Sequence, residues 1–188
     1  MGRMKENISA PEKLKRTHNT KQFDCGNSEL NSWLQVSAFQ SQRADETFTF
    51  VCCCQNDVIA YYSLAIGAIE HQHATPRIIK KLERYSIPVM IISRLAVDKK
   101  FQKQNCGNSI LKDAISRTLL AAKLTGIKVI LVHAEDENVK KFYQKFDFEP
   151  CPVDPFKQML LLKDARKFFK ISFVDTRKKT RKRSKKRT

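Results

Sequence analysis

The sequence lacks the features that would place it in a membrane, in a secreted class or around a metal ion. No apolar stretch approaches the roughly 18–20 residues that cross a bilayer, and residues 1–20 are polar and basic, unlike a secretory signal. The six cysteines form no CxxC pair and have no histidine at metal-ligand spacing. We therefore expect a cytoplasmic protein with no membrane partner and no metal, in which the cysteines are small core or near-surface residues.

Acidic residues are also scarce, because 19 Asp and Glu stand against 36 Lys and Arg and leave a formal charge of +17. Hydrophobic residues make up 41% of the chain, which supplies a core and excludes a wholly disordered protein. The length suits one domain with appendages. Such an excess of positive charge favours a polyanionic partner.

The positive charge is concentrated at the C-terminal end. Residues 163–188 hold thirteen Lys and Arg against two Asp, which is +11 of the total, and residues 1–162 carry the remaining +6. Residues 177–188 contain no apolar side chain, so we expect them to form a disordered arm. Two interpretations stay open: a solvated tail, or an arm that neutralises phosphates and makes binding salt-dependent.

Hydrophobic periodicity predicts an α/β fold. The expected order is helix 28–43, a hairpin of strands 47–54 and 58–66, a short helix or connection at 78–85, strand 88–97, helix 109–125, strand 127–133, helix 137–146 and strand 158–162. A strand, an apolar helix and a second strand can close a right-handed crossover on one sheet. We therefore expect helices packed on a central mixed β-sheet.

Residues 94–109 run from a predicted strand through a polar loop into a helix. Loop amides at a helix N-terminus attract an anion, because the unpaired N–H groups and the positive end of the helix dipole point the same way. Gly107 would let the backbone approach a phosphate, although a lone glycine is weak support. From spacing alone, a phosphate site and an ordinary strand–helix connection both stay open.

The same segment resembles the acetyl-CoA motif of the GNAT N-acetyltransferases. Arg94-Leu-Ala-Val-Asp98 resembles the strand that binds the pantetheine arm, and Gln102-Lys-Gln-Asn-Cys-Gly107 resembles the loop that wraps the pyrophosphate. Residues 132–150, with the pair Phe142-Tyr143, resemble the family's last strand–helix–strand.

Two further segments, residues 23–34 and 59–64, narrow the resemblance to the GNAT-type toxins of toxin–antitoxin systems. The resemblance implies a GNAT fold, a central mixed β-sheet flanked by helices, over residues 21–165. A basic lead-in at 1–20 and a basic, disordered tail at 166–188 would lie on either side of this domain.

The resemblance also implies a function. The toxins acetylate the α-amine of aminoacyl-tRNA from acetyl-CoA, which blocks translation, and they are held in check by a ribbon-helix-helix antitoxin; we also expect a homodimer. Tyr143 would be the general acid that protonates the departing thiolate, and a backbone N–H in the strand would polarise the thioester carbonyl. The residues expected to bind acetyl-CoA are Leu95, Ala96, Val97, Gln102, Lys103, Gln104, Asn105, Cys106, Gly107, Asn108 and Asp136.

Several residues depart from the family's pattern. Asn105 replaces the first loop glycine, and Lys103 and Cys106 stand where glycine and an aliphatic residue are common. Asn105 can adopt the left-handed conformation that the turn needs, although its side chain fills space that glycine leaves open. Asp147 likewise replaces a frequent glycine in a turn that aspartate accepts. Two alternatives therefore stay open: an acetyltransferase for another amine (protein or small molecule), and a cofactor-poor module that binds RNA or its antitoxin.

His133 and Glu135 lie near the predicted active face but stay outside the catalytic set. An α-amino group has a pKa of about 7.7–8.0, so a useful fraction of the acceptor is neutral without a strong general base. Contacts with tRNA phosphates would come from basic side chains, each of which is by default a solvated surface charge. The candidates are Lys13, Lys15, Arg16, Arg43, Arg77, Lys80, Lys81 and the C-terminal arm.

Overall fold

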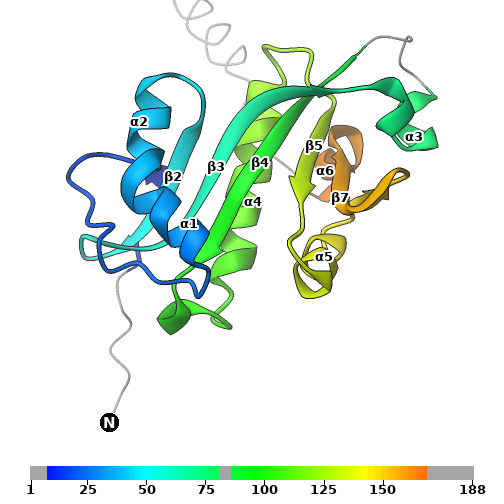
Figure 1. Cartoon of the computed structure of the whole chain (residues 1–188). Coiled ribbons are helices and arrows are strands. Elements are labelled where there is room, and N and C mark those ends of the chain that lie inside the picture. Colours follow the sequence, from blue (N-terminus) through cyan, green and yellow to red (C-terminus); the bar gives the residue numbers. More distant parts are fainter. Residues whose placement is uncertain (1–7, 81–85, 169–188) are drawn as a thin grey trace, which may run out of the picture.

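The computed structural model describes residues 8–80 and 86–168. In this part of the chain seven strands form one mixed sheet in the order β1-β2-β3-β4-β5-β7-β6, with helices on both faces (Figure 1). The strands are β1 (Glu12–Lys13), β2 (Phe48–Cys54), β3 (Asp57–Ile69), β4 (Ile87–Val97), β5 (Val129–His133), β6 (Glu149–Cys151) and β7 (Asp154–Leu161). The helices are α1 (Ser28–Ser32), α2 (Ala38–Arg43), α3 (Pro76–Ile79), α4 (Cys106–Ala121), α5 (Glu137–Gln144) and α6 (Leu162–Phe168). The expected α/β fold with a mixed sheet is confirmed, and the predicted arm at 177–188 lies outside the described residues.

The helix predicted at residues 28–43 consists of three consecutive segments. α1 leads into a π-helical turn at Trp33–Ser37, and α2 continues to Arg43. Leu34 and Ala38 are buried in one cluster with Tyr61 of β3. Because these two residues are four apart, they lie on the same helix face, so the apolar periodicity identified the face that packs on the sheet.

Residues 8–20, expected as part of the lead-in, pack along the edge of the sheet. β1 pairs antiparallel with β2, and Leu14 is only 3% exposed. The Gln42 side chain donates to the Leu14 carbonyl at 2.8 Å, and Arg117 of α4 donates to the Pro11 carbonyl at 2.9 Å. The strand pairing and these two hydrogen bonds use backbone groups of residues 8–20, so the hydrophobic pattern of the sequence does not predict them.

β4, α4 and β5 form the predicted strand–helix–strand unit. β4 and β5 pair in parallel, from Val89 opposite Val129 to Ile92 opposite Val132. α4 buries one face of its length against the sheet, and burial of each such aliphatic side chain contributes about 1.5–3 kcal/mol. The buried residues of this face are Ile110, Leu111, Ala114, Ile115, Thr118 and Leu119. This packing fixes the position of the α4 N-terminus, where the loop of residues 98–105 arrives.

Near the C-terminal end, α6 was not predicted, and β6 was implied only by the resemblance of residues 132–150 to the family's last strand–helix–strand. β6 has only three residues and contains Pro150, so its sequence gives little β signal. The expectation for the cysteines is confirmed, since all six are free and Cys52 and Cys53 are buried. No helix within residues 8–80 and 86–168 is long and apolar enough to cross a membrane.

Candidate active site

β4 and β5 separate in the middle of the sheet. Their parallel pairing ends at Ile92 and Val132, whereas β4 continues to Val97 paired with β3 alone. At the same point β4 contains a bulge: Leu64 of β3 pairs with Ile92 and Ser63 pairs with Arg94, which leaves Ser93 as an extra residue. A bulge bends a strand and increases its twist. One edge of the predicted cofactor strand is therefore free to bind a ligand.

The loop after β4 contains two left-handed residues. Lys103 has φ 61° and Asn105 has φ 67°. Asparagine tolerates this conformation better than most residues, so the expectation that Asn105 can replace the loop glycine in the turn is confirmed. Gln102 ties the loop down, because its side-chain amide donates to the Val97 carbonyl at 2.9 Å and to the Cys25 carbonyl at 3.0 Å.

The backbone of this loop offers a set of free donors. The N–H groups of residues 103–108 have no acceptor within the described part of the chain. They precede or begin α4, a helix of 16 residues, whose dipole adds positive potential at this end. The loop therefore fits an anion such as a diphosphate.

Gly107 lies where the first turn of α4 meets α5 and the end of β4. A Cβ at this position would lie 3.7 Å from the ring of Phe142 and 3.9 Å from Val97, which is ordinary contact. The first turn of α4 thus packs against α5 through the Phe142 ring. This contact brings the helix that carries Tyr143 beside the loop.

Tyr143 lies in the last turn of α5 and is buried, with 5% of its surface exposed. Its ring packs against Phe142 and Phe148, with centroid distances of 5.3 and 5.4 Å. Burial raises the pKa of the phenol well above its usual value, and the Glu135 carboxylate raises it further. Within the described residues the hydroxyl makes no hydrogen bond, and it is not one of the fully buried unpaired polar atoms, which are Thr75 Oγ1 and Gln158 Oε1. The phenol therefore remains protonated at neutral pH and available to a substrate.

Asp136, predicted to contact the cofactor, begins α5. Its carboxylate accepts hydrogen bonds from the N–H groups of Asn138 at 2.7 Å and Val139 at 2.8 Å. This N-cap satisfies two helix donors that would otherwise lack an acceptor. The cap explains why an acidic residue suits this position, and the cofactor contact stays a prediction.

The N-terminal clasp, residues 24–27, joins the two sides of the site and was missed as a functional element. The Asp24 carboxylate lies 2.9 Å from the Lys99 ammonium, and the Asp24 N–H donates to Asp98 at 3.0 Å. At its other end Asn27 donates to Glu135 at 2.9 Å, beyond the end of β5. Residues 23–34 resemble the toxin family, but no pattern in the sequence predicts the partners of Asp24 and Asn27.

These features match a known family. The family model described as "Acetyltransferase (GNAT) domain" matches residues 45–150. The chain belongs to the GNAT acetyltransferase family. The matched region contains the free edge of β4, the loop, α4 and α5, so this part of the fold is that of the family's domain.

This GNAT protein is 37% identical over 158 residues to the tRNA-acetylating toxin of Mycobacterium tuberculosis (strain ATCC 25618 / H37Rv), covering 84% of this chain and 95% of the relative. Its fold matches AtaT complexed with acetyl-methionyl-tRNAfMet, with a TM-score of 0.81, 23% identity and coverage of 87% of this chain and 99% of AtaT. It also matches a Tyr→Phe mutant of AtaT bound to the C-terminus of the antitoxin AtaR and acetyl-CoA, with a TM-score of 0.75, 22% identity and coverage of 87% and 99%.

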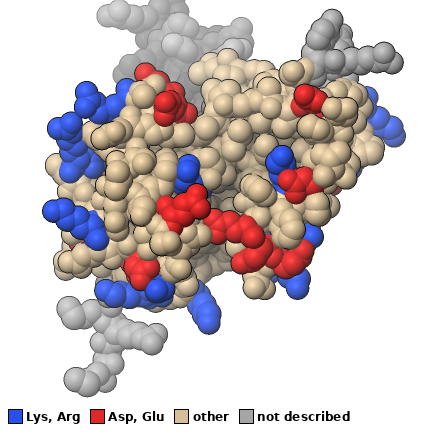
Figure 2. Space-filling model, viewed as in Figure 1, with Lys and Arg blue, Asp and Glu red and all other residues tan. Residues whose placement is uncertain are grey.

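The face of the GNAT domain seen in Figure 2 carries both signs of charge. Acidic side chains gather between α1 and α5, and most of the basic ones lie nearer the outline of the molecule (Figure 2). Of the predicted phosphate contacts, Arg77 is paired with Glu149 and Asp164, and Arg16 lies over the Phe39 ring at 5.3 Å. Lys81 lies outside the described residues.

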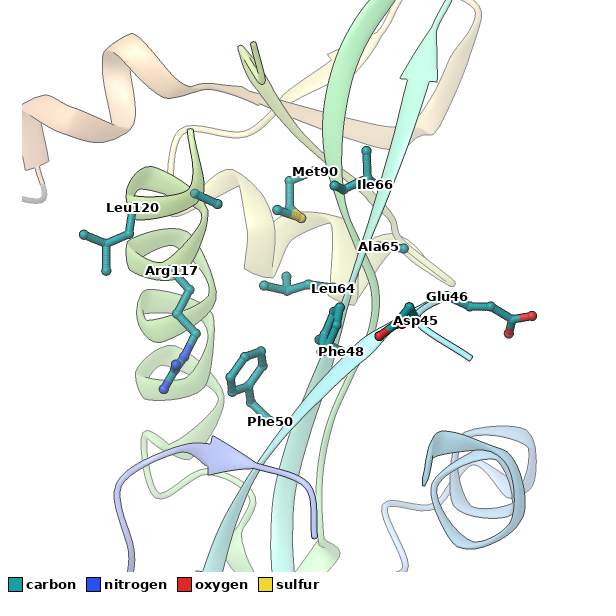
Figure 3. Close-up of a pocket in the computed structure, with 11 residues that line it drawn as sticks. Asp45, Glu46, Phe48, Phe50, Leu64, Ala65, Ile66, Met90, Arg117 and Leu120 are labelled. Carbon is teal, nitrogen blue, oxygen red and sulfur yellow. The ribbon is translucent and has the colours of Figure 1, made fainter. Parts of the chain in front are cut away.

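A cavity of about 480 Å³ lies away from this chemistry. It opens between β2, β3, β4 and the C-terminal half of α4, and its lining includes Phe48, Phe50, Leu64, Met90 and Leu120 (Figure 3). The loop of residues 98–105 is at the other end of α4. This apolar cavity is therefore separate from the site that the loop and Tyr143 form.

Proposed function

We propose that this GNAT acetyltransferase is a toxin that transfers an acetyl group from acetyl-CoA to the α-amine of aminoacyl-tRNA and so blocks translation. The observation that carries the proposal is the 37% identity to a tRNA-acetylating toxin over 95% of that protein. The arrangement of the site supports it, because the backbone N–H groups of residues 103–108, the unpaired edge of β4 and the phenol of Tyr143 surround one part of the molecule.

The residues present fit acetyl-CoA, which supplies the acetyl group as a reactive thioester. The free N–H groups of residues 103–108 would bind its pyrophosphate, and Lys103 would add positive charge. The free edge of Leu95–Val97 would bind the pantetheine arm through backbone groups. Gln102 would hold the loop against the end of this strand, because its side-chain amide donates a hydrogen bond to the Val97 carbonyl.

Acyl transfer needs a neutral amine, a donor for the carbonyl oxygen and a proton for the departing thiolate. A backbone N–H on the free edge of Leu95–Val97 would polarise the carbonyl. Tyr143 holds a proton that its buried surroundings retain at neutral pH, and the thiolate would receive this proton. On forming the C–N bond the amine nitrogen would release one proton to water, and water would return one proton to the phenolate.

Three features of the biological context belong to the same proposal. A ribbon-helix-helix antitoxin would neutralise the enzyme, in line with the antitoxin AtaR bound to the related AtaT mutant. The enzyme would act as a homodimer in the cytoplasm, where charged tRNA is found. The C-terminal basic residues would raise affinity for tRNA phosphates.

The test is acetylation of charged tRNA by the purified full-length protein. With radiolabelled acetyl-CoA, we expect label on the amino acid of aminoacyl-tRNA and none on uncharged tRNA. Calorimetric titration with acetyl-CoA should show binding without tRNA. No labelled aminoacyl-tRNA together with full activity on a protein or polyamine would overturn the proposal, and no acetyl-CoA binding would support the RNA- or antitoxin-binding module instead.

A further inference from the structure

Glu135 is held in one orientation at the corner between β5 and α5. Asn27 accepts hydrogen bonds at Oδ1 from the N–H groups of Glu29 and Leu30, at 2.9 and 3.2 Å. Because these two bonds fix the amide oxygen, the Asn27 Nδ2 must point the other way, and it donates to Glu135 Oε2 at 2.9 Å. The carboxylate is thus positioned by a side chain that is itself positioned by a helix N-terminus.

The second oxygen of Glu135 is left for another donor. Neither an ion pair nor a hydrogen bond to Oε1 occurs among the residues that the structure describes. Arg94, whose charge acts on the pKa of Tyr61 in the opposite direction to that of Glu135, is stacked over the Trp33 ring at 4.2 Å. The nearby hydroxyl of Tyr61 donates to the Leu30 carbonyl at 2.9 Å. Arg94 and Tyr61 therefore have other partners, and within the described residues Asn27 is the donor that Glu135 binds.

Glu135 also lies close to the proposed acid. It precedes α5 by two residues, and its negative charge contributes to the raised pKa of the Tyr143 phenol, after burial. Besides burial, the negative charge of Glu135 also contributes to the raised pKa values of Tyr61 and Cys25, on the α1 side of the sheet. The carboxylate is thus between α1 and Tyr143, beside the region where β4 has left β5.

The acceptor amine can supply a hydrogen-bond donor to the second oxygen of Glu135. At neutral pH much of an α-amino group with a pKa of about 7.7–8.0 is an ammonium ion with three N–H donors. A carboxylate accepts charge-assisted hydrogen bonds from such a group, which are stronger than those between neutral partners. The nucleophile has to reach the acetyl carbon, one bond from the sulfur that Tyr143 would protonate.

We propose that Glu135, oriented by Asn27, binds the α-ammonium group of the acceptor and positions it for acetyl transfer. The identity of the acceptor rests on the proposed function; the role of the carboxylate requires only an amine. The ammonium binds as a cation and loses its proton to water before attack. Glu135 is then a substrate-binding residue, and Asn27 is a positioning residue.

The test compares three variants. Glu135→Gln keeps an acceptor oxygen but removes the charge. Asn27→Asp keeps a helix-capping oxygen but removes the donor to Glu135 and places a like charge against it. Glu137→Gln is the matched control, since it removes the same charge two residues later, where the carboxylate pairs with Lys140 at 3.1 Å.

The readout is the affinity for aminoacyl-tRNA relative to its N-acetylated form, which has no ammonium group. We expect the unmodified protein to prefer the free amine, and Glu135→Gln to reduce this preference about tenfold. Its KM for aminoacyl-tRNA should rise by a similar factor, while the Kd for acetyl-CoA stays unchanged. Asn27→Asp should act in the same direction and Glu137→Gln should have no effect. The proposal is overturned if Glu135→Gln and Glu137→Gln behave alike. It is also overturned if Glu135→Gln weakens acetyl-CoA binding by the same factor as it reduces the preference for the free amine.

Failure of the proposed function gives a different result. If the unmodified protein acetylates another amine and not aminoacyl-tRNA, the tRNA assignment is wrong, and the same variants are compared with that amine and its acetylated form. The carboxylate proposal then stands if Glu135→Gln alone loses the preference, and it falls if the preference remains. A protein that binds acetyl-CoA and acetylates no amine overturns both.

Discussion

The ammonium of Lys99 lies 2.9 Å from the carboxylate of Asp24, a residue 75 positions earlier in the chain. Lys99 follows β4 at the start of the cofactor loop, and Asp24 belongs to the N-terminal clasp. The Lys99 N–H also donates to the Asp24 carbonyl at 2.9 Å. A segment outside the matched domain of residues 45–150 is thus bonded to the loop that would hold the cofactor.

The Asp24 carboxylate should make stability depend on pH. Hydrogen bonds from Lys99, Asn31 and the Gly26 N–H lower its pKa from 3.8 to about 2 in the folded protein. Because the folded pKa lies below the unfolded one, this stabilisation is complete above pH 4 and is lost as the pH falls towards 2. We expect urea unfolding of the unmodified protein to show a larger loss of stability over this interval than Asp24→Asn.

The size of this difference should be small and salt-dependent, since Asp24 and Lys99 are exposed and exposed ion pairs contribute little. Unfolding curves measured with and without added salt at pH 6, 4 and 2 check the assignment. Parallel losses of stability in the two proteins between pH 4 and 2 would show that the clasp carboxylate does not titrate as described.

Asn105→Gly and Asn105→Ala separate the conformation of the loop from its side chain. At φ 67° alanine is strained, so Asn105→Ala should lower the free energy of unfolding by about 1–2 kcal/mol. Glycine adopts this conformation freely, so Asn105→Gly should fold normally and bind acetyl-CoA more tightly because the backbone can approach the pyrophosphate.

Calorimetric titration of both variants with acetyl-CoA, together with urea unfolding, measures the two effects. Lys103→Gly serves as the comparison, since Lys103 shares the left-handed conformation with φ 61° but adds positive charge. Weaker binding by Asn105→Gly than by the unmodified protein would mean that the asparagine side chain itself contacts the cofactor.

Tyr143→Phe should reduce kcat without weakening the fold. Loss of a positioned general acid costs about 10²–10⁴ in rate, while acetyl-CoA affinity should stay unchanged. The hydroxyl of Tyr143 makes no hydrogen bond within the described residues and is not one of the fully buried unpaired polar atoms, so its removal should leave the free energy of unfolding nearly unchanged. Single-turnover kinetics and urea unfolding measure the two quantities.

Tyr62→Phe is the matched control for this prediction. Tyr62 is as buried as Tyr143, but its hydroxyl donates to Asp113 of α4. We expect Tyr62→Phe to lower the free energy of unfolding by about 1–2 kcal/mol and to retain kcat. If both variants keep kcat, Tyr143 is a structural aromatic and another group protonates the thiolate.

The sequence was enough to predict the local part of the site and not its long-range part. The strand, the loop and α4 follow from hydrophobic periodicity, and the left-handed Asn105 follows from the chemistry of asparagine. The bulge at Ser93 has no such signal, because it depends on the register between β3 and β4. The Asn27 to Glu135 bond spans 108 positions of the chain, and no period connects two single polar side chains at that separation.

Removal of residues 177–188 should change RNA binding and not the chemistry. These residues carry nine Lys and Arg with no acidic residue. Each phosphate contact that is lost should make the slope of log K against log salt shallower by about 0.7–0.9. Turnover at saturating aminoacyl-tRNA should stay near that of the full chain, because the loop, Glu135 and Tyr143 all lie within residues 86–168.

A second variant distinguishes charge from length. Replacing the nine Lys and Arg with glutamine keeps the chain length and removes the positive charge, so it should reproduce the shallower salt slope of the truncated protein. Filter binding of charged tRNA across a salt series measures the slopes, and acetylation at saturating substrate measures turnover. If truncation abolishes turnover at saturation while the glutamine variant retains it, these residues must have a structural part in the active site that their charge does not explain.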